Sequence, residues 1–206
     1  MRLIDKLKKG RDPNSTTLSK LVESGDRNFR LGKFRDAIVH YDRALELDPN
    51  NVRALHNKGL AFFGLNKFNK SIEFYDKALK VRPQSLDIIL NKAISLNSLE
   101  KFETAKRLLD EVIMVDPTNK KALNTRALSE FKLGLDEGGM NDLMAALKID
   151  PDYVMAWNNL GCFCLGLGDY DEAIACFEKS LRIEPRDYDA FLLKDMALMR
   201  KEASGK

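Results

Sequence analysis

Apolar and small residues recur at helical spacing through most of the chain, and turn residues interrupt them at regular intervals. In the segment 34–48, for example, Ala37, Tyr41, Ala44 and Leu45 share one side of a helix. Pro49 follows, and proline cannot continue a helix because its ring displaces the backbone hydrogen bond to the preceding turn. The pattern predicts helices of roughly 13 residues, each about 20 Å long, joined by short turns.

The prolines reveal the period of this pattern. Those at positions 49, 83, 117, 151 and 185 are separated by 34 residues each. A fixed period of this length is typical of arrays in which each unit buries its apolar face on its neighbours. With proline at the thirty-second position, the repeats are 18–51, 52–85, 86–119, 120–153 and 154–187. The sequence predicts one antiparallel helix pair in each repeat.

Residues at matching positions identify the type of repeat. The fifth repeat contains, in order, Trp157, Leu160, Gly161, Gly168, Tyr170, Ala173, Phe177 and Pro185, and the first contains Gly25, Gly32, Phe34, Ala37, Tyr41, Ala44 and Pro49. These residues resemble the tetratricopeptide repeat family, and the resemblance covers residues 18–187. It implies an all-α fold, a right-handed superhelix of antiparallel helix pairs.

Residue size along the repeat fits this interpretation. Small residues such as Gly59, Ala78 and Ala173 stand where two helix backbones approach, and large residues at the seventeenth and twenty-fourth positions are expected to fill the next unit's hole. The fourth repeat departs from the pattern, with Asp136 at the seventeenth position followed by Gly138-Gly139. Glycine costs about 1 kcal/mol relative to alanine in a helix, so a softer joint is expected there, through a hinge or through sequence drift.

The charge balance narrows the classes of partner. The chain has 34 Lys and Arg against 31 Asp and Glu, so its net charge of +3 does not favour a nucleic-acid partner. No segment approaches the roughly 18 apolar residues that a membrane span needs. The first fifteen residues lack the apolar segment of a secretory signal, and we therefore expect a cytoplasmic protein.

The two ends differ from the repeats. Residues 1–17 form a basic segment, in which Met1–Lys9 is predicted to be a short helix that docks on the first pair, or else a basic anchor for an acidic partner or membrane. Residues 188–206 are predicted to be a capping helix and tail. Met196, Leu198 and Met199 make this cap apolar, so another chain is expected to pack there, and a homodimer through the cap is one possibility.

Residues with chemical potential do not form a catalytic or metal-binding pattern. Cys162, Cys164 and Cys176 lack the paired spacing of zinc ligands, and we interpret them as reduced thiols. His40 and His56 lie more than a hundred residues from them. No phosphate-binding loop, nucleophile motif or metalloprotease motif occurs. The sequence predicts no catalytic residue, no metal and no cofactor, and therefore not an enzyme.

The resemblance implies that the concave face of the first helices binds ligand. Position six of repeats two to five holds Asn57, Asn91, Thr125 and Asn159. Carboxamides spaced one repeat apart can pair with the backbone of an extended peptide, whatever its sequence. The other predicted groove residues are Arg53, His56, Phe63, Lys121, Asn124, Phe131 and Asn158. A two-carboxylate clamp is not expected, because only Asn91 and Lys121 match its pattern.

These observations predict a non-catalytic scaffold that binds an extended or helical peptide segment of another protein in its groove. Two alternatives stay open. The repeats could be the substrate-binding region of a larger enzyme, as the similarity to glycosyltransferase repeats implies, or the chain could assemble with copies of itself.

Overall fold

The computed structural model describes residues 13–205, and the predicted all-α fold is confirmed. The helices are α2 (Pro13–Arg30), α3 (Phe34–Leu47), α4 (Val52–Gly64), α5 (Phe68–Val81), α6 (Leu86–Asn97), α7 (Phe102–Val115), α8 (Lys120–Lys132), α9 (Asp136–Ile149), α10 (Val154–Leu167), α11 (Tyr170–Ile183) and α12 (Tyr188–Ser204). The predicted helix at Met1–Lys9 lies outside the described residues.

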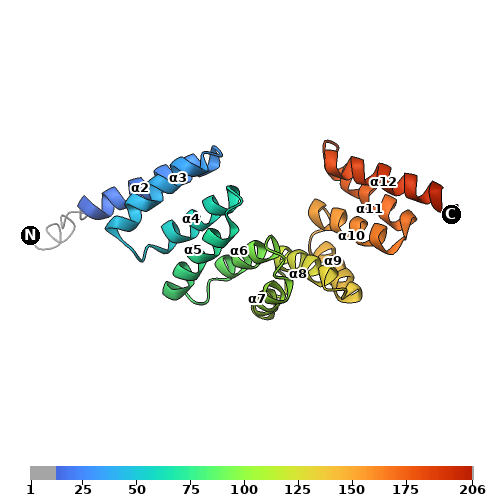
Figure 1. Ribbon diagram of the computed structural model, residues 1–206, viewed down its shortest axis with the longest axis horizontal. Coiled ribbons are helices and arrows are strands. Elements are labelled where there is room, and N and C mark those ends of the chain that lie inside the picture. The colour runs from blue at the N-terminus through green and yellow to red at the C-terminus, as the bar shows by residue number, and fades with distance from the viewer. Residues whose placement is uncertain (1–12, 206) are drawn as a thin grey trace, which may run out of the picture. The chain divides into compact units, whose positions relative to one another are not determined.

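The chain divides between Leu99 and Glu100 into two compact units. In the first unit, α2 packs with α3 and α4 with α5, and α6 packs on α5 (Figure 1). In the second unit, α8 packs with α9 and α10 with α11, while α7 packs on α8 and α12 on α11. Within each unit, therefore, helices that are consecutive in the sequence are neighbours in space, as expected for tandem helix pairs.

An Asp-Pro turn ends one pair and starts the next. The Asp48 carboxylate accepts hydrogen bonds from the Asn50 backbone N–H at 3.1 Å and from Asn51 Nδ2 at 3.2 Å. Asn51 Oδ1 in turn accepts the Ala54 N–H at 3.0 Å and caps α4. Asp116 and Asn119 repeat this arrangement before α8. These side chains bind turn and helix N–H groups that the helices themselves leave unpaired.

The turn that joins the two helices of each repeat contains one left-handed residue, at position fifteen. Its φ angle is 70° at Gly32, 57° at Asn66, 58° at Glu100, 73° at Gly134 and 84° at Gly168. Glycine and asparagine tolerate this conformation, whereas a side chain such as that of glutamate makes it costly. Glu100 is therefore a strained position in an otherwise compatible series.

Replacing Glu100 with glycine is expected to raise the free energy of unfolding by about 1 kcal/mol, because relief of the left-handed strain exceeds the added entropy of the unfolded chain. Denaturant unfolding followed by circular dichroism measures this change. Gly168→Ala is the control in the opposite direction. A Cβ there would meet no atom within 4 Å, but φ is 84°, so the left-handed backbone alone should make this variant less stable. A Glu100→Gly variant no more stable than the native chain would contradict the interpretation.

The core of three helix pairs is built from a glycine beneath an aromatic ring. Position eight is glycine where position twenty-four of the same repeat is Tyr or Phe, and a Cβ on the glycine would overlap the ring. The separations between that Cβ and the nearest ring carbon would be 2.4 Å for Gly25 and Tyr41, 2.5 Å for Gly59 and Tyr75, and 2.6 Å for Gly161 and Phe177. These rings, which the sequence pattern predicts in the next unit's hole, also close over the glycine of their own repeat.

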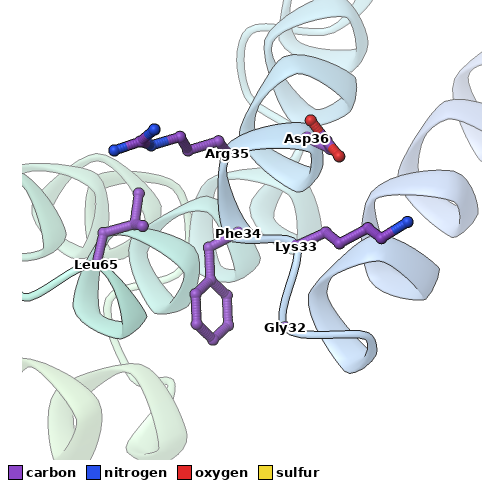
Figure 2. Close-up of a pocket in the computed structure, with 6 residues that line it drawn as sticks. All are labelled: Gly32, Lys33, Phe34, Arg35, Asp36 and Leu65. Atoms are coloured by element: carbon purple, nitrogen blue, oxygen red, sulfur yellow. The ribbon is translucent and has the colours of Figure 1, made fainter.

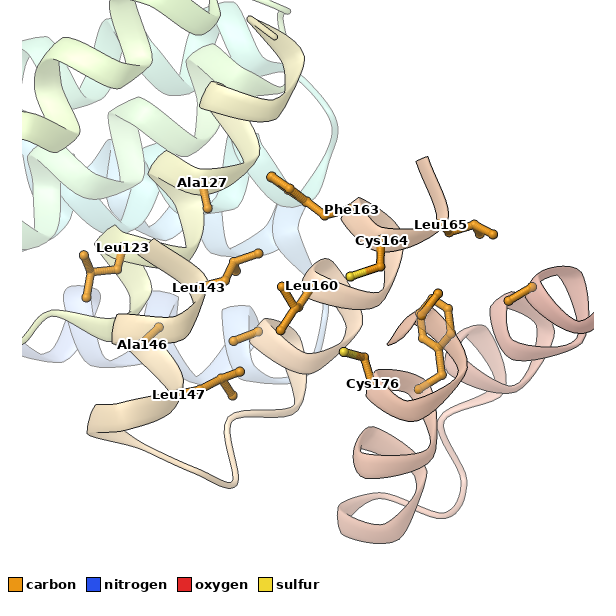
Figure 3. Packing of buried hydrophobic residues seen from close by; sticks show 14 residues of the cluster. Leu123, Ala127, Leu143, Ala146, Leu147, Leu160, Phe163, Cys164, Leu165 and Cys176 are labelled. Atoms are coloured by element: carbon orange, nitrogen blue, oxygen red, sulfur yellow. The ribbon is translucent and has the colours of Figure 1, made fainter. Parts of the chain in front are cut away.

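The fourth repeat has a different pair of residues at positions eight and twenty-four. Ala127 and Leu143 occupy positions eight and twenty-four, and both are fully buried in the cluster of Figure 3. The glycine pair that suggested a soft joint makes room for neighbours. A Cβ on Gly139 would lie 2.7 Å from the Phe163 ring, and one on Gly138 would lie 2.9 Å from Glu130 Oε2. These glycines permit close approach rather than mark a gap in packing.

Candidate ligand-binding face of the first helices

The site predicted from the sequence lies on the first helix of each pair, and we call it the first-helix face. In the first unit, Asp26 of α2 organises the side chains of α4. Its carboxylate accepts hydrogen bonds from Tyr41 Oη at 2.8 Å, from Asn57 Nδ2 at 2.7 Å and from Arg53 Nη2 at 2.5 Å. Burial, and then the bond to Asp26, raise the pKa of Tyr41, which stays a neutral donor. Asn57 and Arg53 are therefore brought together by Asp26.

His56 and Asn91 form the next contact on this face. Asn91 Nδ2 and His56 Nε2 are 2.8 Å apart, and the imidazole lies against the Tyr75 ring with 5.8 Å between ring centroids. Burial lowers the pKa of His56, an effect that Asp87 partly opposes. The neutral imidazole is the form that can accept a hydrogen bond from the Asn91 amide.

The second unit carries two similar contacts. Asn159 Nδ2 donates to Asn124 Oδ1 at 2.9 Å, and Asn124 is only 4% exposed. Asn158 Nδ2 donates to Asp187 Oδ2 at 2.7 Å, and the other oxygen of Asp187 caps α12. Asn124 and Asn158 therefore hold neighbouring helices together as well as lying on the predicted face.

Position six asparagines share a common geometry. The amide nitrogens of Asn57, Asn91 and Asn159 each bond to the first helix of the preceding repeat. Their carbonyl oxygens accept no hydrogen bond from any residue in 13–205. Thr125 takes this position in the fourth repeat, where its hydroxyl donates to the Lys121 carbonyl at 2.7 Å, while the Lys121 side chain is exposed.

The two phenylalanines of the predicted site are half-buried and pack on other rings. Phe63 lies 5.3 Å from Phe68 of its own repeat, measured between ring centroids. Phe131 lies 4.2 Å from Phe163, and a Cβ on Gly166 would touch its ring at 3.0 Å. Position seventeen of the fourth repeat is Asp136 rather than an aromatic residue, and Phe131 supplies an aromatic ring from the first helix of that repeat. Both rings contribute to packing between helices.

A series of ion pairs between adjacent repeats was not predicted from the sequence. A cation at position seven contacts a carboxylate at position twenty-five of the repeat before it: Lys58 with Asp42, Lys92 with Asp76 at 2.6 Å, Arg126 with Asp110 at 2.7 Å, and Lys194 with Glu178 at 2.7 Å. Between repeats four and five, Leu160 and Met144 occupy these positions instead. Comparing charges in the 34-residue register would have found this series.

A group of charged residues in the second unit was also missed, and we call it the charge cluster: Lys106, Asp110, Arg126, Glu130 and Asp142. Arg126 binds both oxygens of Asp142 at 2.7 Å and one oxygen of Asp110 at 2.7 Å. The bond to Asp142 is the main reason that the pKa of Arg126 is raised. Lys106 Nζ lies 3.1 Å from Asp110 Oδ2 and 3.6 Å from Glu130 Oε1. The cluster joins α7, α8 and α9.

The described residues bring together no group of three or more His, Cys, Asp or Glu side chains that could hold a metal ion. Cys164 and Cys176 are buried on the adjacent helices α10 and α11 (Figure 3). Cys162 is half-buried. Among the helices of residues 13–205, none is both long and apolar enough to cross a membrane.

Comparison with known families identifies the repeats. The tetratricopeptide repeat model matches residues 52–85 and 154–187, the ranges assigned from the sequence to the second and fifth repeats, and a second TPR repeat model matches residues 25–66. Together with the helix pairs, these matches show that the chain belongs to the tetratricopeptide repeat family.

Solved structures show the same fold. PilW, a type IV pilus biogenesis factor, superposes with a TM-score of 0.80 at 22% identity, covering 90% of this chain and 88% of PilW. A thermophilic TPR protein from Thermus thermophilus, TTC0263, gives 0.76 at 22% identity, with 88% and 99% covered. YrrB gives 0.65 at 17% identity, with 89% and 98% covered. No curated protein matches the chain in sequence. The tetratricopeptide repeats support a protein–protein interaction scaffold, and the solved structures show the shared fold.

Proposed function

We propose that this protein is a non-catalytic cytoplasmic adaptor that binds an extended or helical segment of a partner protein on its first-helix faces. The observation that carries the proposal is the set of unpaired carbonyl oxygens on Asn57, Asn91 and Asn159. An extended peptide has a free backbone N–H at each non-proline residue, and these oxygens are acceptors for such groups.

The contacts between repeats prepare these asparagines for binding. Because each amide nitrogen is bonded to the preceding first helix, the side chain loses little further freedom when its oxygen binds a ligand. Arg53, whose side chain is 63% exposed, and the exposed Lys121 add positive charge for acidic ligand side chains. The proposed array comprises the repeats in 18–187, with 188–206 as its cap.

One structural neighbour is consistent with this role. YrrB is described as a TPR protein with an unusual peptide-binding site. Its identity of 17% shows a shared fold, and a fold hosts many functions, so the proposal rests on the asparagine geometry.

Substituting both Asn57 and Asn91 by alanine is expected to weaken partner binding about fivefold to 150-fold, since each lost acceptor contributes about 0.5–1.5 kcal/mol. The partner is first captured from the native cell extract with the unaltered chain and identified by mass spectrometry. Calorimetry with the captured segment then compares the native chain and the variant.

The matched control is Asn69→Ala with Asn141→Ala, the same chemical change at exposed positions of second helices. This control should bind normally, and circular dichroism should show unchanged helix content in both double variants. Equal affinity of the native chain and the Asn57/Asn91 variant would contradict the proposal. Loss of helix together with binding would assign the asparagines a structural role only.

A second copy of the chain is the other candidate partner. On α12, Phe191, Met196 and Met199 are 51%, 41% and 68% exposed, while Ala190 and Ala197 are buried. An apolar surface of this kind is typical of an interaction site. Light scattering would reveal pairing as a mass twice that of the 23.4 kDa chain.

A further inference from the structure

The turn of the fourth repeat borders a cavity of about 630 Å³, lined by residues 134–138 together with Lys106 and Glu130. The matching turns of the first two repeats, residues 32–36 and 66–70, border smaller cavities of about 380 and 270 Å³. There the other wall is a leucine, Leu65 or Leu99, whereas the fourth-repeat cavity faces charged side chains of α7 and α8.

The chemistry of the fourth turn is reversed relative to the turns of the first two repeats. In the first repeat the turn carries Phe34 with Lys33 and Arg35 on either side, and Figure 2 shows their charged ends extending away from the ring. The fourth repeat has Asp136 in place of the ring and Glu137 after it. The first turn is therefore basic and carries an aromatic side chain, whereas the fourth turn is acidic and lacks one.

Glu130 adds a buried carboxylate to this cavity. It stands at position eleven, where repeats two, three and five have the buried apolar residues Phe62, Leu96 and Cys164. Its side chain is 9% exposed, and its Oε2 has no hydrogen-bond partner in the part of the chain that the structure describes. Gly138, which lines the cavity, lies directly against the buried Oε2, since a Cβ there would be 2.9 Å away.

The charge cluster does not fully compensate Glu130. Arg126 is engaged by Asp110 and Asp142, and Lys106 lies closer to Asp110 than to Glu130. Three carboxylates thus share two cations. Burial, and then the charge of Asp142, raise the pKa of Glu130, as expected for a carboxylate that lacks a full partner. Buried polar atoms are normally paired, so an unpaired carboxylate oxygen beside a cavity indicates a missing donor.

We propose that this cavity, which we call the fourth-turn pocket, binds a lysine or arginine side chain of a partner protein. The ammonium or guanidinium group donates to Glu130, and Asp136 and Glu137 add negative charge at the rim. Leu135, which is 47% exposed, contacts the aliphatic stem of the ligand. The charge of Lys106 opposes the binding of a cation. However, the pocket is lined by three carboxylates and this one cation, and Lys106 is paired with Asp110.

Nuclear magnetic resonance of the ¹⁵N-labelled full chain tests this proposal. The probes are N-acetyl-arginine methylamide, N-acetyl-lysine methylamide and the neutral N-acetyl-norleucine methylamide. We expect saturable shifts of the Gly134 and Gly138 amides with one or both cationic probes, at dissociation constants of about 1 mM, and none with the neutral probe. The cationic probe with the lower dissociation constant indicates whether lysine or arginine is the ligand residue.

Two variants locate the binding in the pocket. Glu130→Gln keeps the shape of the side chain and removes its charge, and it should weaken cation binding at least tenfold. Asp136→Phe restores the aromatic residue of the first two repeats and should also abolish binding. Glu172→Gln is the control, the same chemical change at an exposed position in the first turn of α11, and it should bind normally.

Three results would overturn the proposal. They are equal shifts with the neutral and cationic probes, unchanged binding by both pocket variants, or saturation of the same amides by Ca²⁺ at a lower concentration than by the arginine or the lysine probe. The Asn57/Asn91 variant separates this proposal from the peptide-binding function. It should leave the glycine shifts unchanged, because neither asparagine lines the fourth-turn pocket.

Discussion

Replacing Arg126 with methionine is expected to lower the free energy of unfolding by about 3 kcal/mol. Arg126 binds both oxygens of Asp142 and one oxygen of Asp110, and the Asp142 side chain is only 9% exposed. Removal of the guanidinium therefore leaves a nearly buried carboxylate without its cation, and that cost exceeds the value of the ion pair itself. Urea unfolding followed by circular dichroism measures the effect.

A matched control and a rescue variant separate charge from packing. Arg107→Met makes the same change at an exposed position of α7 and should shift stability by less than about 0.5 kcal/mol. Adding Asp142→Asn to the Arg126→Met chain should recover part of the loss, because the stranded charge is removed. If Arg126→Met were as stable as the Arg107→Met control, the charge cluster would have no role in holding α7, α8 and α9 together.

Replacing Gly59 with alanine is expected to cost about 2 kcal/mol, even though alanine favours a helix by about 1 kcal/mol over glycine. The new Cβ would lie 2.5 Å from a ring carbon of Tyr75, and Tyr75 is fully buried and unable to move aside freely. Overlap in a packed core is relieved only by displacing the ring or the helices.

The fourth repeat provides the compensating change for this second prediction. There alanine at position eight accompanies leucine at position twenty-four, as Ala127 and Leu143. Tyr75→Leu should therefore destabilise the native chain yet recover stability in the Gly59→Ala background. A double-mutant cycle measures the coupling, which should exceed about 1 kcal/mol. Additive effects of the two substitutions would show that the glycine is not required by the ring.

Several parts of the fold follow from the sequence for local reasons. The prolines at 34-residue spacing, the Asp-Pro turns and the apolar periodicity act over a few residues, so they predict where helices start and stop. The size match between Gly59 and Tyr75 is also visible once the repeats are placed in register. Glu130 is visible in that register too, as a charged residue at a position that is apolar in three other repeats.

The candidate site was predictable only in outline. Position six pointed to Asn57, Asn91 and Asn159, and the structure places all three between neighbouring first helices. Their partners were not predicted, because Asp26, His56 and Asn124 lie 31 or 35 residues away and reach the asparagines only after two helix pairs have packed. Periodicity encodes which positions face one another, but not which atoms pair.

By itself, the sequence determined the all-α class, the tandem repeats and the family, because a helix pair is specified by short-range patterns that recur with a constant period. Only the tertiary structure decided which side chains pair across repeats. It showed that the asparagine nitrogens are already used within the array, that Arg126 is divided between two aspartates, and that one oxygen of Glu130 has no partner among the described residues. Such facts depend on distances and burial between residues far apart in the chain, where angstrom differences separate a made hydrogen bond from a missing one.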